Sequence, residues 1–119
     1  MVNNQRFIIV HANIPYSIIE DGYTLKKKLN ATEKDYTVWN RELDGFNKID
    51  NAILVNGHSP TIFPDLFPLG YYKEDCLGKI LKLKNRYNVD CGIAYRDRFI
   101  DANLAALRLD DLKEFYLYE

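Results

Sequence analysis

Two short apolar runs, each closely followed by a histidine, constrain the fold of this 119-residue chain most strongly. Residues 6–12 read RFIIVHA and residues 52–58 read AILVNGH, and both runs are rich in side chains that favour strands. Continuous rather than alternating hydrophobicity is typical of strands that are buried on both faces of a sheet. We therefore expect two core strands of an α/β fold, over residues 6–12 and 52–56.

One helix is expected between these strands, over residues 33–44. Thr32 followed by Asp35 resembles a capping box, in which the two ends of the first turn satisfy free backbone groups. Trp39 and Leu43 recur on one face of such a helix. Because Trp39 lies on this apolar face, we expect it to be a core residue rather than a binding residue.

The second half of the sequence predicts shorter elements. Residues 61–78 are rich in prolines and aromatic side chains and predict a long ordered loop that packs on itself. Alternation over residues 79–84 predicts a strand with one wet face, and residues 86–93 predict another short strand. Residues 103–109 and 113–118 flank Asp-Asp-Leu, the pattern of a tight antiparallel hairpin. The expected architecture is thus a mixed sheet with a C-terminal hairpin.

Composition bounds the function classes. The chain is 47% apolar and 13% aromatic, enough for one packed domain over residues 1–119. Sixteen basic against 17 acidic residues leave no positive excess for non-specific nucleic-acid binding. The apolar runs are too short to span a membrane. Two cysteines, Cys76 and Cys91, cannot form a disulfide framework, so we expect reduced thiols and a cytoplasmic location.

Both histidines of the chain, His11 and His58, occupy equivalent positions after an apolar strand. Ligands collect at the carboxyl ends of strands in α/β sheets, because side chains there project into the crevice beyond the sheet. Two imidazoles that meet at such an edge can share one metal ion. The alternative is that each histidine only caps its strand by a hydrogen bond. We expect the two imidazoles to lie in one crevice.

The order of five motifs carries a resemblance to a known family. They are VHANIP at 10–15, WNRE at 39–42, GHSP at 57–60, NVDCG at 88–92 and the closing LAALRLDDLKEFYLY. Together they resemble the C-terminal half of a calcineurin-like metallophosphoesterase. The nearest branch is that of the prokaryotic and phage-type serine/threonine protein phosphatases, which are related to the diadenosine tetraphosphatases. The resemblance implies part of an αββα sandwich.

The resemblance also implies a metal-dependent hydrolase site. In that family the two matching histidines, here His11 and His58, bind one ion of a dinuclear centre that clamps phosphate and activates water. Manganese, iron or zinc suit mixed imidazole and carboxylate ligands. Arg41 of WNRE matches an arginine that binds substrate phosphate. Its alternative role is an exposed helical arginine in an ion pair. No catalytic acid or base of the family falls on this chain.

Three further residues of these motifs are expected to be neither metal ligands nor nucleophiles. We expect Asn13 to make a local Asx turn rather than to contact substrate. Asp90 is expected to support the site without being a ligand. Ser59 follows His58, but the sequence offers no third group to orient that histidine as its base, so a serine-hydrolase site is disfavoured.

The sequence lacks the family's other motifs, GD-x-H-G, GD-x-x-D-R-G and GNHE. These motifs supply the remaining ligands, so we expect the chain alone to be inactive and either to pair with a missing N-terminal half or to self-associate. The expected substrate is a phosphorylated molecule: a phosphoprotein, a dinucleotide or a small phosphate ester. The alternative is a non-catalytic binding or interaction module derived from the same fold.

Overall fold

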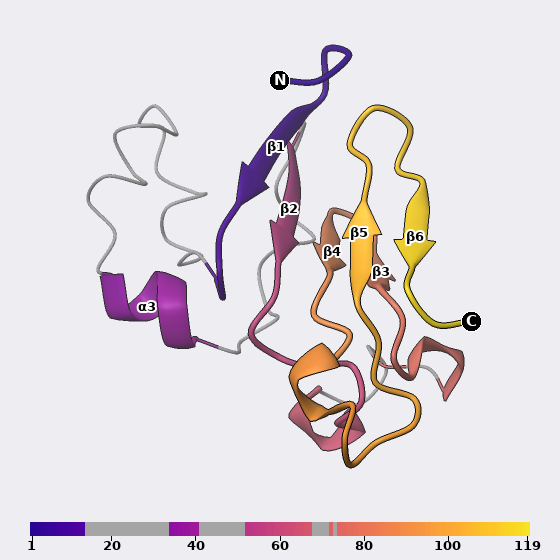
Figure 1. Cartoon of the computed structure of the whole chain (residues 1–119). Helices are drawn as coiled ribbons and strands as arrows, with labels where there is room; N and C mark the ends of the chain where they lie inside the picture. Colours follow the sequence, from indigo (N-terminus) through magenta and orange to yellow (C-terminus); the bar gives the residue numbers. More distant parts are fainter. Residues whose placement is uncertain (14–33, 41–51, 68–71, 73) are drawn as a thin grey trace.

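The computed structural model describes residues 1–13, 34–40, 52–67, 72 and 74–119 (Figure 1). The fold is mixed α/β and rich in sheet, with one α-helix among the described residues. Of the predicted helix over residues 33–44, the part before Lys34 and the part after Asn40 lie outside these ranges, Arg41 included. The described residues contain no helix of the length and apolarity that a membrane crossing requires.

A four-stranded mixed sheet organises the molecule, with strand order β1-β2-β4-β3. Its members are β1 (Arg6–Ile9), β2 (Ala52–Asn56), β3 (Leu81–Leu83) and β4 (Arg86–Asn88). β1, β2 and β4 run parallel, whereas β3 is antiparallel to β4 (Figure 1). Because the three parallel strands end at one edge, the residues that follow them gather there.

The prediction for β2 is confirmed, whereas burial of β1 on both faces is wrong. β2 has the expected bounds and buries four of its five residues. In β1, Ile8 is 4% exposed but Ile9 is 67% exposed. Successive side chains of a strand point to opposite faces, and within the described part of the chain β1 pairs with β2 alone. β1 is therefore an edge strand there, with one covered face.

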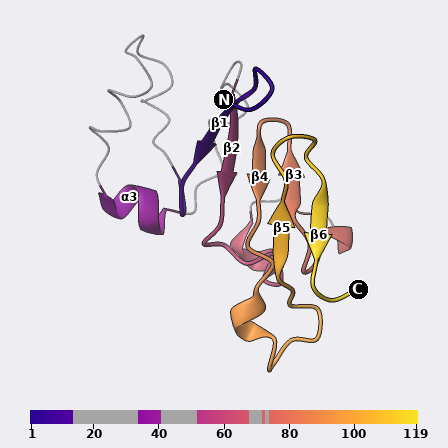
Figure 2. The ribbon, with the colours of Figure 1, turned by 45° about the horizontal axis from the view of Figure 1, so that its top comes forward.

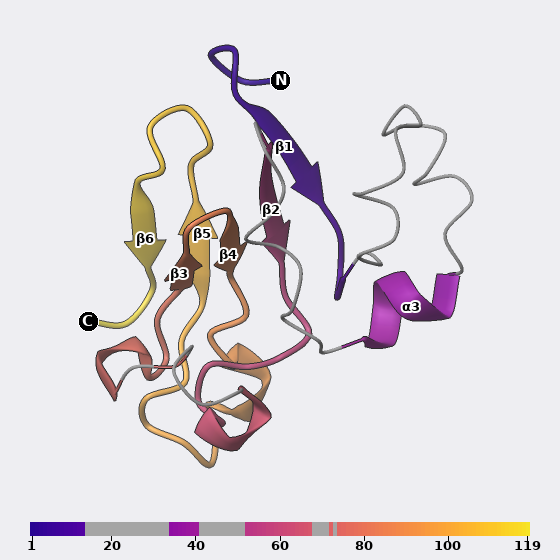
Figure 3. The same cartoon turned by 180° about the vertical axis from the view of Figure 1, so that it is seen from behind.

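The helix α3 (Lys34–Trp39) lies beyond the carboxyl end of β1 (Figures 1 and 3). Its end is shorter than predicted, because Asn40 is already outside the helix. The backbone nitrogen of Ala12 donates to the carbonyl of Thr37 over 2.7 Å, which joins the helix to the chain that leaves β1. The helix thus belongs to the same edge of the sheet as the strand ends.

The predicted loop over residues 61–78 packs on its own side chains, as expected for the residues described. It contains two 3-10 turns, η2 (Pro64–Leu66) and η3 (Glu74–Cys76). The Phe67 and Tyr72 rings stack with centroids 5.4 Å apart, and Phe67 clusters with Leu81 of β3. A third turn, η4 (Ile93–Tyr95), follows β4. This apolar cluster anchors the loop to β3, the strand at the opposite edge of the sheet from β1.

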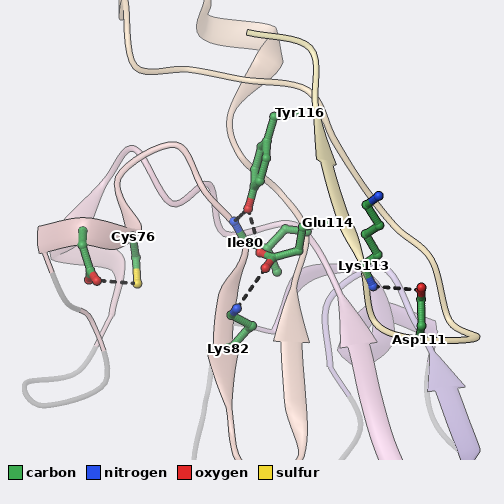
Figure 4. A network of polar contacts seen from close by, with 8 residues as sticks. Cys76, Ile80, Lys82, Asp111, Lys113, Glu114 and Tyr116 are labelled. Carbon is green, nitrogen blue, oxygen red and sulfur yellow. Dashed lines mark hydrogen bonds and ion pairs between the residues drawn. The ribbon is translucent and has the colours of Figure 1, made fainter. Parts of the chain in front are cut away.

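The C-terminal hairpin is confirmed: β5 (Ala105–Leu107) pairs antiparallel with β6 (Glu114–Tyr116). The hairpin stands in front of β3 and β4 as a second layer (Figure 2). Two polar contacts fix it to β3 and to the residue before it, and a third, within β6, links them (Figure 4). The Tyr116 hydroxyl accepts from the Ile80 backbone nitrogen at 3.0 Å and donates to Glu114 at 2.7 Å, while Lys82 donates to Glu114 at 2.9 Å.

Replacing Tyr116 by phenylalanine should lower the free energy of unfolding by about 2 kcal/mol, because the partly buried Ile80 N–H loses its acceptor. Urea denaturation at neutral pH measures the difference. Tyr118→Phe is the matched control, since Tyr118 is 41% exposed and its change should stay within about 0.5 kcal/mol. Equal effects of the two variants would show that the Tyr116 hydroxyl contributes nothing to docking.

The same contacts predict a limited pH range of full stability. Burial alone would raise the pKa of Glu114, but hydrogen bonds from Lys82 and Tyr116 lower it below the ordinary value. A lowered carboxyl pKa stabilises the fold above the ordinary pKa, and that stability disappears as pH falls through the folded value. Burial raises the pKa of Tyr116, so its contribution disappears as pH rises past the ordinary tyrosine value.

We therefore expect the melting temperature to fall on both the acid and the alkaline side of neutrality. Glu114→Gln should reduce the fall of the melting temperature on the acid side and leave most of the fall on the alkaline side in place. Thermal unfolding followed by circular dichroism from about pH 3 to about pH 11 measures this. If the melting temperature of Glu114→Gln falls as steeply on the acid side as that of the original chain, Glu114 is not the cause of that fall.

Candidate metal centre

His11 and His58 lie together at the carboxyl edge of the sheet, as the sequence predicts. Their imidazole centroids are 5.1 Å apart, with the rings tilted by 52°. Each residue follows the end of a strand, and β1 and β2 are neighbours that run parallel. The Gly57 backbone nitrogen donates to the His11 carbonyl over 2.8 Å. The two segments that carry the histidines are thus joined directly.

The backbone of His58 adopts a left-handed conformation, with φ of +71°. Histidine is among the residues that tolerate this region, but a side chain with a Cβ still pays roughly 1 kcal/mol or more for it. Hydrogen bonds on the residues that follow hold the turn: Asn88 Nδ2 donates to the Ser59 carbonyl at 2.7 Å, and Thr61 N donates to the Asp90 carbonyl at 2.9 Å. Backbone strain of this kind concentrates at functional sites.

A buried polar network lies beneath the two histidines. Arg86 of β4 is only 3% exposed, and its Nε donates to Asn56 Oδ1 at 2.9 Å. Its Nη2 lies 3.5 Å from the carbonyl of Ala12, next to His11. Asn56 donates in turn to the Gly57 carbonyl at 3.0 Å, next to His58. One guanidinium therefore supports both histidine segments.

Sequence reasoning missed this network, although its residues carry a signal. Asn56 is a polar residue within a run that is otherwise apolar, and Arg86 and Asn88 alternate with Tyr87 in β4. A polar side chain in a central strand has to find partners inside the protein. Such residues predict a buried network, but the sequence alone does not say which carbonyls they bind.

The end of α3 completes the site and corrects the prediction for Trp39. The Trp39 side chain is 65% exposed, so it is not a core residue. Its ring contacts His58 instead, with centroids 5.4 Å apart and planes at 81°. The next residue, Asn40, accepts a 2.6 Å hydrogen bond from Asn13 Nδ2, which is two residues beyond His11. Asn13 therefore makes a long-range contact that the expectation of a local turn did not include.

Of the other residues named from the sequence, the structure describes Asp90, Ser59 and both cysteines. Arg41 lies outside the described residues, so phosphate binding by Arg41 stays a prediction. Asp90 Oδ1 accepts from the Gly92 backbone nitrogen at 3.0 Å, in agreement with a structural role. Ser59 is buried. Neither cysteine is in a disulfide, and burial raises the pKa of Cys91 to about 12, which makes that thiol unreactive at neutral pH.

The histidine pair fits one divalent ion, though only as part of its ligand set. An ion about 2.0–2.1 Å from one nitrogen of each ring places the two ring centroids roughly 5 Å apart, close to the separation present. The Nε2 atom of His58 is buried, so protein atoms surround this side of the ring. Within the part of the chain that the structure describes, no group of three or more histidine, cysteine or acidic side chains is placed to bind an ion.

Comparison of the chain with protein-family models, with curated proteins and with solved structures finds no match. The resemblance to metallophosphoesterases therefore stays a prediction that rests on the order of the motifs.

Proposed function

We propose that this chain is part of a metal-dependent phosphoesterase of the protein phosphatase type, in which His11 and His58 bind one divalent ion. The observation that carries the proposal is the 5.1 Å separation of their imidazoles at the shared end of two parallel strands. The second layer formed by the hairpin supports a place for the chain within an αββα sandwich (Figure 2). The substrate class is a phosphate ester.

Imidazole ligands suit manganese, iron or zinc, and such an ion supplies the Lewis acidity that phosphate-ester hydrolysis requires. The chain's own contribution is to hold the ligands in place before the ion arrives. Arg86 and Asn56 fix the carbonyls beside the histidines, and Asn13 ties the His11 segment to the residue after α3. Contacts that order the ligand-bearing segments in advance reduce the entropy lost when the ion binds.

Two imidazoles are fewer ligands than a catalytic metal centre normally has. We therefore propose that the remaining ligands come from a further segment or a partner, as the family resemblance implies. The same shortage of ligands among the described residues favours a second candidate, a non-catalytic module that keeps the ion site. Both candidates predict negligible hydrolysis of p-nitrophenyl phosphate by this chain alone with manganese. Turnover that disappears in His58→Asn would contradict both the non-catalytic candidate and the proposal that the remaining ligands come from elsewhere.

Metal binding is testable through Trp39, which is the only tryptophan of the chain. Its ring lies 5.4 Å from His58, so a quenching ion such as Ni²⁺ at the histidine pair should lower the fluorescence saturably. His11→Ala and His58→Asn should each weaken binding by about 100-fold or more, because losing a ligand costs more than losing its supporting partner. Asparagine is chosen at residue 58 because it tolerates the left-handed backbone.

Cys76→Ser is the matched control, since Cys76 is a half-buried thiol remote from the histidines in sequence that could bind Ni²⁺ adventitiously. Its titration should superimpose on that of the original chain. Circular dichroism of every variant establishes that it is folded. Quenching that does not saturate, or that survives unchanged in both histidine variants, would overturn the proposed ion site.

A further inference from the structure

We propose that Trp39 is a stacking surface that selects aryl phosphates, in which the phosphate is joined to a planar aromatic ring. The inference rests on the proposed function and adds a substrate class to it. An indole that is 65% exposed presents a large apolar face to water, and this one touches the ring of a metal-binding histidine. A face that is exposed and also adjacent to the reacting centre can bind the part of a substrate next to its phosphate.

Several contacts hold the segment that carries the indole, and one contact is made by the indole itself. Trp39 is the last residue of α3, and Thr37 in the same helix accepts a hydrogen bond from Ala12. Asn40, the next residue, is bound to Asn13 at 2.6 Å. The His58 ring lies perpendicular to the indole and contacts it directly. The surface is therefore pre-organised, which reduces the entropy lost when a ring stacks on it.

The geometry favours a ring that is joined closely to the phosphate. Trp39 contacts His58 itself, so a group that stacks on the indole lies next to a phosphate bound at the histidine pair. An aryl ester has one oxygen between ring and phosphorus and meets this condition. The base of a nucleotide is separated from its phosphate by a ribose and meets it poorly. Aromatic stacking should raise affinity by about tenfold at most.

The test compares phenylphosphonate with methylphosphonate, which resist hydrolysis, on the full chain with Zn²⁺ bound. The indole N–H of the only tryptophan gives one resonance in a ¹H–¹⁵N spectrum, and the backbone resonances of the His11 and His58 segments report on binding in every variant. We expect phenylphosphonate to bind about tenfold more tightly and to shift the indole resonance, whereas methylphosphonate leaves that resonance in place.

Trp39→Leu should bring the affinity ratio of the two phosphonates close to one, and Trp39→Phe should keep part of it. Phe115→Leu is the matched control, because Phe115 is a partly exposed aromatic residue on β6, and its loss should leave the ratio unchanged. Adenosine monophosphate forms a further arm. If the gain in affinity that depends on Trp39 is larger for this nucleotide than for phenylphosphonate, the aryl class is overturned.

The two proposals fail in different ways. If Zn²⁺ shifts the resonances of the histidine segments but phenylphosphonate gains nothing over methylphosphonate, or neither phosphonate binds, the stacking inference is wrong and the ion site stands. If Zn²⁺ leaves the histidine segments unchanged, the proposed function is wrong and the inference falls with it.

Discussion

Replacing Gly78 by alanine should lower the free energy of unfolding by about 4 kcal/mol, the largest effect we expect from one methyl group in this chain. Gly78 has φ of +67°, a left-handed conformation that costs any residue with a Cβ. A Cβ built there would lie 1.8 Å from the backbone oxygen of Asp101. Because that atom belongs to the main chain, the segment after η4 would have to move.

Thermal unfolding measures this effect as a fall in melting temperature of about 15 °C. Gly57→Ala is the matched control, since its nearest neighbours would be 3.6 and 3.7 Å from the new Cβ, an ordinary contact distance. Gly92→Ala should fall between the two, because its Cβ would meet the side chain of Ile62 at 2.8 Å rather than a backbone atom. A Gly78→Ala protein as stable as Gly57→Ala would show that the approach of Asp101 is wrong.

Replacing Arg86 by methionine should cost about 3 kcal/mol, because two buried acceptors lose their donor at about 1–3 kcal/mol each. The acceptors are Asn56 Oδ1 at 2.9 Å and the Ala12 carbonyl at 3.5 Å. Methionine has a similar length without the charge, so the loss of packing is small. Urea denaturation gives the difference, and Ni²⁺ titration should show weaker binding, since both histidine segments lose support.

Arg98→Met is the control for Arg86, because the Arg98 side chain is 72% exposed and its replacement should stay within about 0.5 kcal/mol. The double variant Arg86→Met, Asn56→Leu should regain part of the lost stability, since removing both partners of a buried hydrogen bond costs less than removing one. No recovery in the double variant would mean that Asn56 is not the partner that matters.

Local patterns in the sequence predicted the elements whose contacts are local or whose apolar residues follow a regular pattern. β2 has the predicted bounds because a run of apolar residues suits a strand covered on both faces. The hairpin of β5 and β6 forms where Asp-Asp-Leu separates two alternating segments. The meeting of His11 and His58 followed from one rule, that neighbouring parallel strands end at the same edge.

The tertiary structure alone decided which apolar side chains are buried, because burial depends on which elements pack against one another. Ile8 and Ile9 are both apolar, yet one is buried and the other exposed, because neighbouring side chains of β1 point to opposite faces and only one of these faces is covered. Trp39 has the spacing of a core residue, but the helix ends at it and the indole lies against His58. A spacing pattern specifies the face of a helix and not the partner of that face.

The sequence by itself determined that a histidine closely follows each of two strand-forming runs and that a hairpin closes the chain. Only the folded chain decided that Arg86, on a third strand, contacts the Ala12 carbonyl beside His11 and, through Asn56, supports the Gly57 carbonyl beside His58. The physical reason is that a buried hydrogen bond depends on the positions of two groups far apart in sequence, which become neighbours only when the sheet assembles.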